Sequence, residues 1–295
     1  MAPLSSRSPR KRGSSADNAT LTAHSDALMD TRKSLKQRTG ALTALGWTIT
    51  DNKQRLLGAL NILKDPSEQI ELRLAVLAVL QSATFSPERL ERIRADYLKA
   101  LRKVSSDANI EMRQRALGML AREHDPQTQQ QLLEGLKNPN VALVPPEKAL
   151  QLLGYDVHSD AYPVARSIVE TPPNETAKRE ALRLLAADGA SAPLFETILM
   201  DKGESSEIRQ LSASALHTLA PDRLQACARK ITLDTTEPSD IRSVGVTALT
   251  HFGDINTIRH DGVLNTYLQE LGNEATAGDE TLKSAARQYV AKLLS

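Results

Sequence analysis

Apolar residues recur along most of the chain at offsets of three, four and seven positions, which places them on one face of an α-helix. Short breaks separate these segments, and each break combines a turn or N-cap former with proline, as at Asp65-Pro66, Ser86-Pro87 and Glu237-Pro238. Proline suits the first turn of a helix and disfavours helix in the residue before it. The pattern therefore predicts an all-α protein whose ordered body starts near Ser25.

Two of the predicted helices repeat one another. The first has the pattern Glu207-Ile208-Arg209 followed by Ala213, Ala215, Leu216 and Leu219; the second has Asp240-Ile241-Arg242 followed by Val246, Ala248, Leu249 and Phe252. The offset between them is 33 residues. A fixed period in this range is typical of a helical solenoid, in which each unit buries its apolar face against its neighbours. We therefore expect an α-solenoid (superhelix) of stacked antiparallel helix pairs.

Two helix types alternate in this array. One carries paired leucines and ends at Asp65-Pro66 or Asn138-Pro139. The other carries a basic anchor followed by small or apolar residues three, four and seven positions later. Its anchors are Arg73, Arg113, Lys178, Arg209, Arg242 and Lys283.

The combination of a leucine helix, an Asp-Pro turn and an Ile/Val-Arg-x-x-Ala helix resembles the HEAT-repeat family (HEAT/armadillo-like), in particular its short repeats first associated with phycobilin lyases. The resemblance covers roughly residues 50–295 and departs from the pattern where Pro146 replaces the basic anchor and where Arg287 occupies an apolar position. It implies that the basic anchors bond within or between repeats. The alternative is that they line a groove for an acidic partner.

Charge divides the chain unevenly. Residues 1–40 hold eight basic and three acidic residues, a net charge of +5, so the remainder of the chain carries −4. We expect residues 1–20 to be a disordered basic arm and residues 21–295 to be a single HEAT-like solenoid, with 21–65 as its amino-terminal cap and 275–295 as its carboxy-terminal capping helix. Trp47, the single tryptophan, is predicted to lie in the core of that cap; the alternative is an exposed anchor for a partner.

Motifs for chemistry are missing from the sequence. It has one cysteine, Cys227, six histidines without the spacing of a metal site, and no phosphate loop or nucleophile motif. We therefore expect no catalytic residue, no metal and no cofactor, and a protein that is not an enzyme. The longest apolar run, Leu74 to Leu80, is far shorter than the roughly 20 residues that span a membrane. These observations predict a soluble, cytoplasmic protein.

The resemblance also implies that the anchor-bearing helices line a concave surface, so that residues one, five and eight positions beyond each anchor point into it. The resulting protein-binding candidates are Gln114, Arg179, Arg183, Gln210, Ser214, His217, Ser243, Thr247 and Thr250. The expected function is that of a non-catalytic scaffold or adaptor that binds another protein through an acidic or hydrogen-bonding segment. Two alternatives remain: a HEAT-like enzyme, either a chromophore lyase or a DNA glycosylase, and a nucleic-acid-associated protein that acts through the basic arm.

Overall fold

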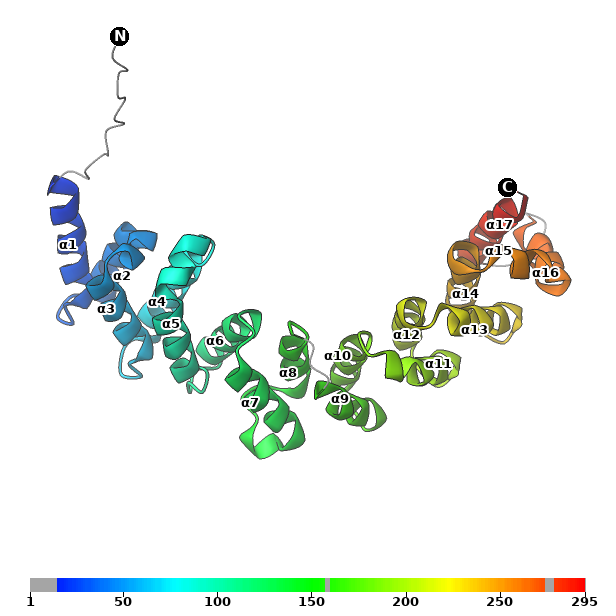
Figure 1. Ribbon diagram of the computed structural model, residues 1–295, viewed down its shortest axis with the longest axis horizontal. Helices are drawn as coiled ribbons and strands as arrows, with labels where there is room; N and C mark the ends of the chain where they lie inside the picture. Colours follow the sequence, from blue (N-terminus) through cyan, green and yellow to red (C-terminus); the bar gives the residue numbers. More distant parts are fainter. Residues whose placement is uncertain (1–14, 157–159, 274–278, 295) are drawn as a thin grey trace, which may run out of the picture. The chain divides into compact units, whose positions relative to one another are not determined.

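The computed structural model describes residues 15–156, 160–273 and 279–294, and all regular structure within these ranges is helical (Figure 1). The prediction of an all-α fold built from stacked helix pairs is confirmed. No helix in the described ranges combines the length and apolar character needed to cross a membrane. The chain divides into two units, Met1–Thr128 and Gln129–Ser295, which are described separately below. A single solenoid over residues 21–295 stays a prediction.

The first unit contains three successive helix pairs. Its elements are α1 (Ser15–Met29), α2 (Leu35–Leu45), the 3-10 helix η1 (Gly46–Asp51), α3 (Lys53–Lys64), α4 (Ile70–Ala83), α5 (Pro87–Val104) and α6 (Ile110–Arg122). Helix α1 packs on α2, α3 on α4, and α5 on α6. Between pairs, α2 packs on α4 and α3 on α5, so helices of the same type are stacked in rows.

The helical body begins earlier than the sequence predicted, because α1 starts at Ser15 rather than near Ser25. Leu28 of this helix is completely buried, and its carbonyl oxygen accepts a hydrogen bond of 2.9 Å from Arg38 Nε. Arg38 therefore binds α1 to α2 and belongs to the folded body. The segment Ser6 to Arg12, which carries most of the charge of the predicted arm, lies outside the described residues.

Trp47 is not a core residue, so this prediction is wrong. Helix α2 ends at Leu45, and the next residue, Gly46, has a positive φ of 50° that glycine adopts readily and begins η1. The tight turn buries Ile49 completely and leaves Trp47 47% exposed. The Arg89 guanidinium lies over the indole, with its Cζ 3.7 Å from the ring centroid.

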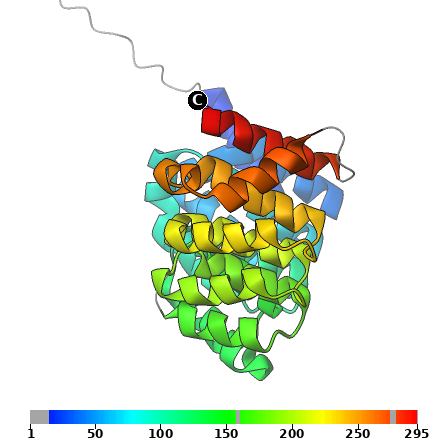
Figure 2. The same cartoon turned by 90° about the vertical axis from the view of Figure 1, so that its right-hand side faces the viewer.

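The second unit continues the same alternation. The boundary between the units falls within α7 (Pro126–Lys137). The elements that follow are η2 (Pro139–Val141), α8 (Pro146–Leu153), α9 (Ala161–Glu170), α10 (Glu175–Leu185), η3 (Gly189–Ser191), α11 (Ala192–Met200), α12 (Ser206–Leu219), α13 (Pro221–Leu233), α14 (Ser239–Phe252), α15 (Ile255–Arg259), α16 (Gly262–Gly272) and α17 (Glu280–Leu294). Helix α9 pairs with α10, α11 with α12, α13 with α14, and α16 with α17. The anchor-bearing helices α10, α12, α14 and α17 contact one another in sequence, and Figure 2 shows the helices of this unit in successive rows.

The 33-residue repeat has the predicted packing. Leu216 and Leu249, which occupy equivalent positions of α12 and α14, are 0% and 1% exposed. Close approach of α13 and α14 depends on Gly245, because a Cβ atom there would lie 2.9 Å from the backbone oxygen of Ala228. The equivalent residue of α12 is the small, fully buried Ser212.

Candidate functional site

The basic anchors bind the repeats to one another. Arg209 shows the arrangement most completely, since its Nε donates to the carbonyl oxygen of Leu199, ten residues earlier, at 2.8 Å. Its Nη1 and Nη2 donate to the two carboxylate oxygens of Glu237, in the next repeat, at 2.7 and 2.9 Å. Arg38 repeats this geometry with Leu28 and Glu68. The structural interpretation of the anchors is thus supported, and the sequence analysis missed Arg38 as their first member.

The acidic partners come from a recurring Asp-x-x-Glu turn between the two helices of a pair. The turns are Asp65 to Glu68, Asp201 to Glu204 and Asp234 to Glu237. In each turn the aspartate Oδ1 accepts a hydrogen bond from the backbone N–H two residues later, at 2.8 to 2.9 Å. The glutamate then pairs with an anchor of the preceding repeat, namely Arg38, Lys178 or Arg209. This motif was visible in the sequence and was overlooked.

Other anchors depart from this geometry. Arg73 donates to Leu63 O at 3.0 Å but pairs with Asp107 instead of a glutamate. Arg113 donates to the backbone oxygen of Asp107 at 2.7 Å. Arg242 reaches Thr232 O at 3.4 Å and lies over the Tyr267 ring.

A second set of ion pairs links the other row of helices. Arg102 of α5, Arg166 of α9 and Arg229 of α13 each pair with an aspartate that precedes the next helix of their row, namely Asp125, Asp188 or Asp261. Hydrogen bonding to Arg229 lowers the pKa of Asp261. Burial alone would raise the pKa of Asp188, but hydrogen bonds from Ser191 and Arg166 outweigh it, so this pKa is also lowered.

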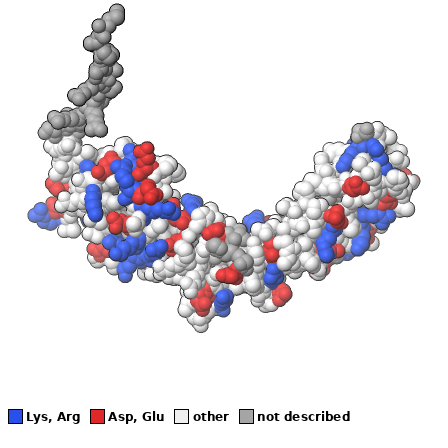
Figure 3. All heavy atoms as spheres, viewed as in Figure 1, with Lys and Arg blue, Asp and Glu red and all other residues white. Residues whose placement is uncertain are grey.

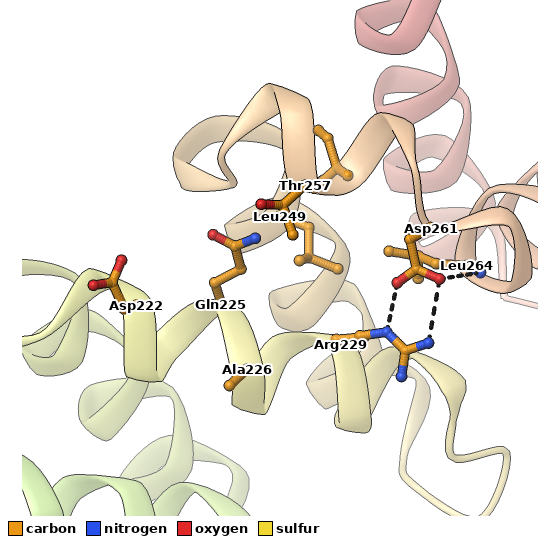
Figure 4. A pocket seen from close by; sticks show the side chains of 9 residues that line it. Asp222, Gln225, Ala226, Arg229, Leu249, Thr257, Asp261 and Leu264 are labelled. Atoms are coloured by element: carbon orange, nitrogen blue, oxygen red, sulfur yellow. Dashed lines mark hydrogen bonds and ion pairs between the residues drawn. The ribbon is translucent and has the colours of Figure 1, made fainter.

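The pocket beside Arg229 has a volume of about 330 Å³ and lies between α13, α14, α15 and α16 (Figure 4). Several of its polar groups are already engaged. Asp261 accepts hydrogen bonds from Arg229 and from the Leu264 backbone N–H, and Gln225 Oε1 accepts one from the Asp254 N–H. We therefore regard this pocket as part of the packing between helices.

A larger groove of about 520 Å³ lies along the anchor-bearing helices α12, α14 and α17. It brings together five of the nine predicted binding residues: Gln210, Ser214, His217, Ser243 and Thr247. Side chains of Ala213, Leu224, Val244 and Ala248 give it an apolar lining, and Asp240 and Thr281 complete it.

One wall of the groove is aromatic. Phe252, at the end of α14, stacks on His217 of α12 with ring centroids 3.5 Å apart and an interplanar angle of 26°. Phe252 remains 45% exposed, although the repeat pattern predicted an apolar packing position. His251 is a second neighbour of the Phe252 ring, at 6.0 Å.

Hydrogen-bonding groups in the groove are free for a ligand. Gln210, Ser214 and Thr247 are exposed, and their side chains form no hydrogen bond within the described part of the chain. The Ser243 hydroxyl instead donates to the Ser239 carbonyl oxygen at 2.8 Å. The groove thus combines small apolar residues, one aromatic wall and three available polar side chains.

The other four predicted residues lie elsewhere. Thr250 is buried, and its hydroxyl donates to the Val246 carbonyl at 2.8 Å. Gln114 belongs to α6 of the first unit. The charges of Arg179 and Arg183 are compensated by Glu207 and Glu180, so the predicted contiguous patch of these two arginines with Gln210 and Ser214 is not a free basic surface.

Within the described ranges, no group of three or more His, Cys, Asp and Glu side chains is arranged to hold a metal ion. Cys227 is buried, and burial raises the pKa of its thiol.

No family model and no curated relative matches the sequence. A solved structure of human deoxyhypusine hydroxylase in complex with glycerol is similar over 85% of this chain and 99% of that chain, with 12% sequence identity and a TM-score of 0.34. The prediction that the chain is not an enzyme is contradicted by this match, because the matched protein is an enzyme, and we withdraw it.

Proposed function

We propose that the chain is a short-repeat, HEAT-type protein that binds a segment of another protein in the groove formed by α12, α14 and α17. The observation that carries the proposal is the convergence of Gln210, Ser214, His217, Ser243 and Thr247, from two consecutive repeats, on one groove of about 520 Å³. Repeat proteins stack their units into extended binding surfaces. A groove with an apolar lining suits the apolar side chains of a bound peptide or helix.

The lining defines the chemistry of the bound segment. An apolar side chain would cover the exposed part of Phe252 beside Val244 and Ala248. Polar groups of the segment would bond Gln210, Ser214 and Thr247, whose side chains have no partner among the described residues. Among the described residues that line the groove, Asp240 alone is an Asp, Glu, Lys or Arg, so a hydrogen-bonding segment fits better than a strongly acidic one.

The proposal can be tested by blocking the groove. Thr247 is exposed and lines it, so Thr247→Arg places a long charged side chain across the binding surface. Thr218→Arg is a matched control, because Thr218 is an exposed threonine on α12 that does not line the groove. Each tagged full-length variant would be recovered from the native host, and the associated proteins identified by mass spectrometry and re-tested in purified form.

A groove partner should bind the wild type and the Thr218→Arg variant equally and bind Thr247→Arg at least about tenfold more weakly, equivalent to roughly 1.4 kcal/mol. Phe252→Ala should weaken the same partner, since exposed aromatic side chains are common anchors. A partner that binds all four proteins equally would show that the groove is not its site. Partners lost equally in both arginine variants would indicate general misfolding, which circular dichroism would reveal.

A further inference from the structure

Trp47 belongs to η1, at one end of the helix pairs of the first unit. At this end α3 begins, and so does the turn that connects α4 to α5. Because α3 and α4 are antiparallel neighbours, the start of α3, the end of α4 and the start of α5 lie at the same end of the helix pairs. The turn between α4 and α5 contains Phe85, which is 84% exposed. The tryptophan and this phenylalanine are therefore large apolar side chains presented to solvent at one end of the same unit.

The backbone around Trp47 holds the indole in this exposed position. Ile49 of the same 3-10 helix is fully buried, and Thr50 Oγ1 donates to the Trp47 carbonyl oxygen at 2.8 Å. Arg89 covers one face of the ring, with its Cζ 3.7 Å from the centroid. The exposed surface of Trp47 is thus held in place on a short, anchored helix, which reduces the entropy lost when a partner covers it.

Arg89, which covers the indole, and Arg92, three residues later on α5, share one carboxylate. Arg89 Nε and Arg92 Nη2 each lie 3.8 Å from Asp51 Oδ1, longer than a hydrogen bond. Buried anchors of the same unit are paired differently, since Arg38 contacts both oxygens of Glu68 at 2.9 and 2.6 Å. The Arg92 side chain is 59% exposed. Its Nε donates to the Glu88 carbonyl oxygen at 3.2 Å, so the Nη groups are the part of this exposed guanidinium that can bind a second carboxylate.

We propose that Trp47, Arg89 and Arg92 form a second docking surface, which binds a protein segment that carries a carboxylate next to an apolar side chain. The carboxylate would bind the Arg92 guanidinium, whose planar fork matches its two oxygens, and the apolar side chain would cover Trp47. Tryptophan and arginine are, with tyrosine, the residue types enriched among energetically dominant interface positions. This proposal does not depend on the groove of the second unit.

The charges near Trp47 favour a protein segment over a nucleic acid. Asp51, Glu88 and Glu91 lie on or next to the elements that carry the two arginines, and they would repel a phosphate backbone. Figure 3 likewise shows acidic and basic side chains intermixed over the first unit. A single carboxylate, by contrast, can bind to the exposed Arg92 guanidinium alone.

A peptide display library of 12-residue random sequences, panned against the full chain, provides the test. Enriched peptides should carry Asp or Glu within three residues of Leu, Ile, Phe or Trp. Because Trp47 is the single tryptophan, binding of peptides without tryptophan should change the intrinsic fluorescence of the protein directly. A single-stranded oligothymidylate of 12 nucleotides serves as the nucleic-acid probe.

Two variants decide the outcome. Trp47→Ala and Arg92→Glu should each weaken the enriched peptides about tenfold or more, measured by anisotropy of labelled peptide. Arg94→Glu is the matched control, because Arg94 lies on the same helix with a 48% exposed side chain and pairs with Glu123. The groove variant Thr247→Arg should bind the peptides as the wild type does.

Enriched peptides that bind Trp47→Ala and Arg92→Glu normally, or a library without enrichment, would overturn the proposal. Tight, strongly salt-dependent binding of oligothymidylate that quenches Trp47 would identify a nucleic-acid surface and also overturn it. Arg92→Glu changes an exposed side chain, so it tests the proposal even if Trp47→Ala fails to fold.

Discussion

Arg209 and Glu237 form a buried, doubly hydrogen-bonded ion pair between consecutive repeats, with side chains 2% and 1% exposed. Loss of one partner from such a pair leaves an uncompensated charge in a water-poor environment. The pair therefore fixes how the turn before α14 lies against α12.

Replacement of Glu237 by glutamine should lower the free energy of unfolding by about 3 to 5 kcal/mol, because the Arg209 charge stays buried without its counter-ion. Urea denaturation followed by circular dichroism measures this change. As a control, Arg223→Gln breaks an ion pair with Glu196 in which the arginine is 51% exposed, and it should cost at most about 1 kcal/mol. Equal effects of the two substitutions would contradict a structural role for the buried pair.

Acid should weaken the contact between Arg38 and Glu68. Hydrogen bonding to Arg38 lowers the pKa of Glu68 below its value of about 4.3 in an unfolded chain. The carboxylate therefore stabilises the fold above the unfolded pKa, and this stabilisation is lost as the pH falls through the folded value. Urea midpoints should show Glu68→Gln to be less stable than the wild type at pH 7, with a difference that narrows below about pH 4. A difference that is constant from pH 7 to pH 3 would exclude this linkage.

The two glycines Gly245 and Gly40 should respond oppositely to substitution by alanine. At Gly245 the new methyl group would lie 2.9 Å from a backbone oxygen of α13, so Gly245→Ala should destabilise the fold by about 1 to 3 kcal/mol through overpacking. Gly40, inside α2, has no atom within 4 Å of the added carbon, and Gly40→Ala should stabilise by about 0.5 to 1 kcal/mol through helix propensity. Thermal melts of both variants test the contrast, and a stabilised Gly245→Ala protein would refute the close-packing argument.

Substitutions at a core position and at a groove position of α14 should differ in their effects on stability and on partner binding. Leu249 is 1% exposed, and its replacement by alanine should cost about 2 to 5 kcal/mol. Phe252 is 45% exposed, so Phe252→Ala should cost clearly less while it weakens partner binding. Chemical denaturation and partner titration of both variants provide the comparison. A Phe252→Ala loss as large as that of Leu249→Ala would show that the ring is mainly a packing element.

Helical periodicity alone predicted the helix types and the burial of Leu216 and Leu249, because these depend on residues within one or two repeats. Five of the twelve residues that line the groove were predicted from the same register, since Gln210 and Thr247 occupy equivalent faces of α12 and α14. The burial of Thr250 was not predicted by this register. Its helix is covered by α17, and the Thr250 carbonyl oxygen accepts a hydrogen bond from Lys292, 42 residues away.

The sequence analysis also failed to predict which charged side chains form ion pairs. Arg179 appeared as part of a basic patch because its partner Glu207 lies 28 residues away, on another helix. The exposure of Trp47 depends on a backbone reversal at Gly46 and on Arg89 from α5. Both outcomes are set by contacts between elements, which hydrophobic periodicity does not report.

The anchors Arg209 and Arg242 each donate to the carbonyl oxygen ten residues earlier, so their two repeats share one register. If residues 205–237 were lost by unequal recombination, Glu204 would be followed by Pro238, as Glu237 is in the intact chain. The residue ten positions before Arg242 would then be Leu199, whose carbonyl oxygen serves Arg209 in the intact chain. Lys178 would keep Glu204 as its partner. The deletion would also remove Arg209 and Glu237 together, so within the row of anchors a repeat could be lost during evolution without leaving either partner of this buried pair behind.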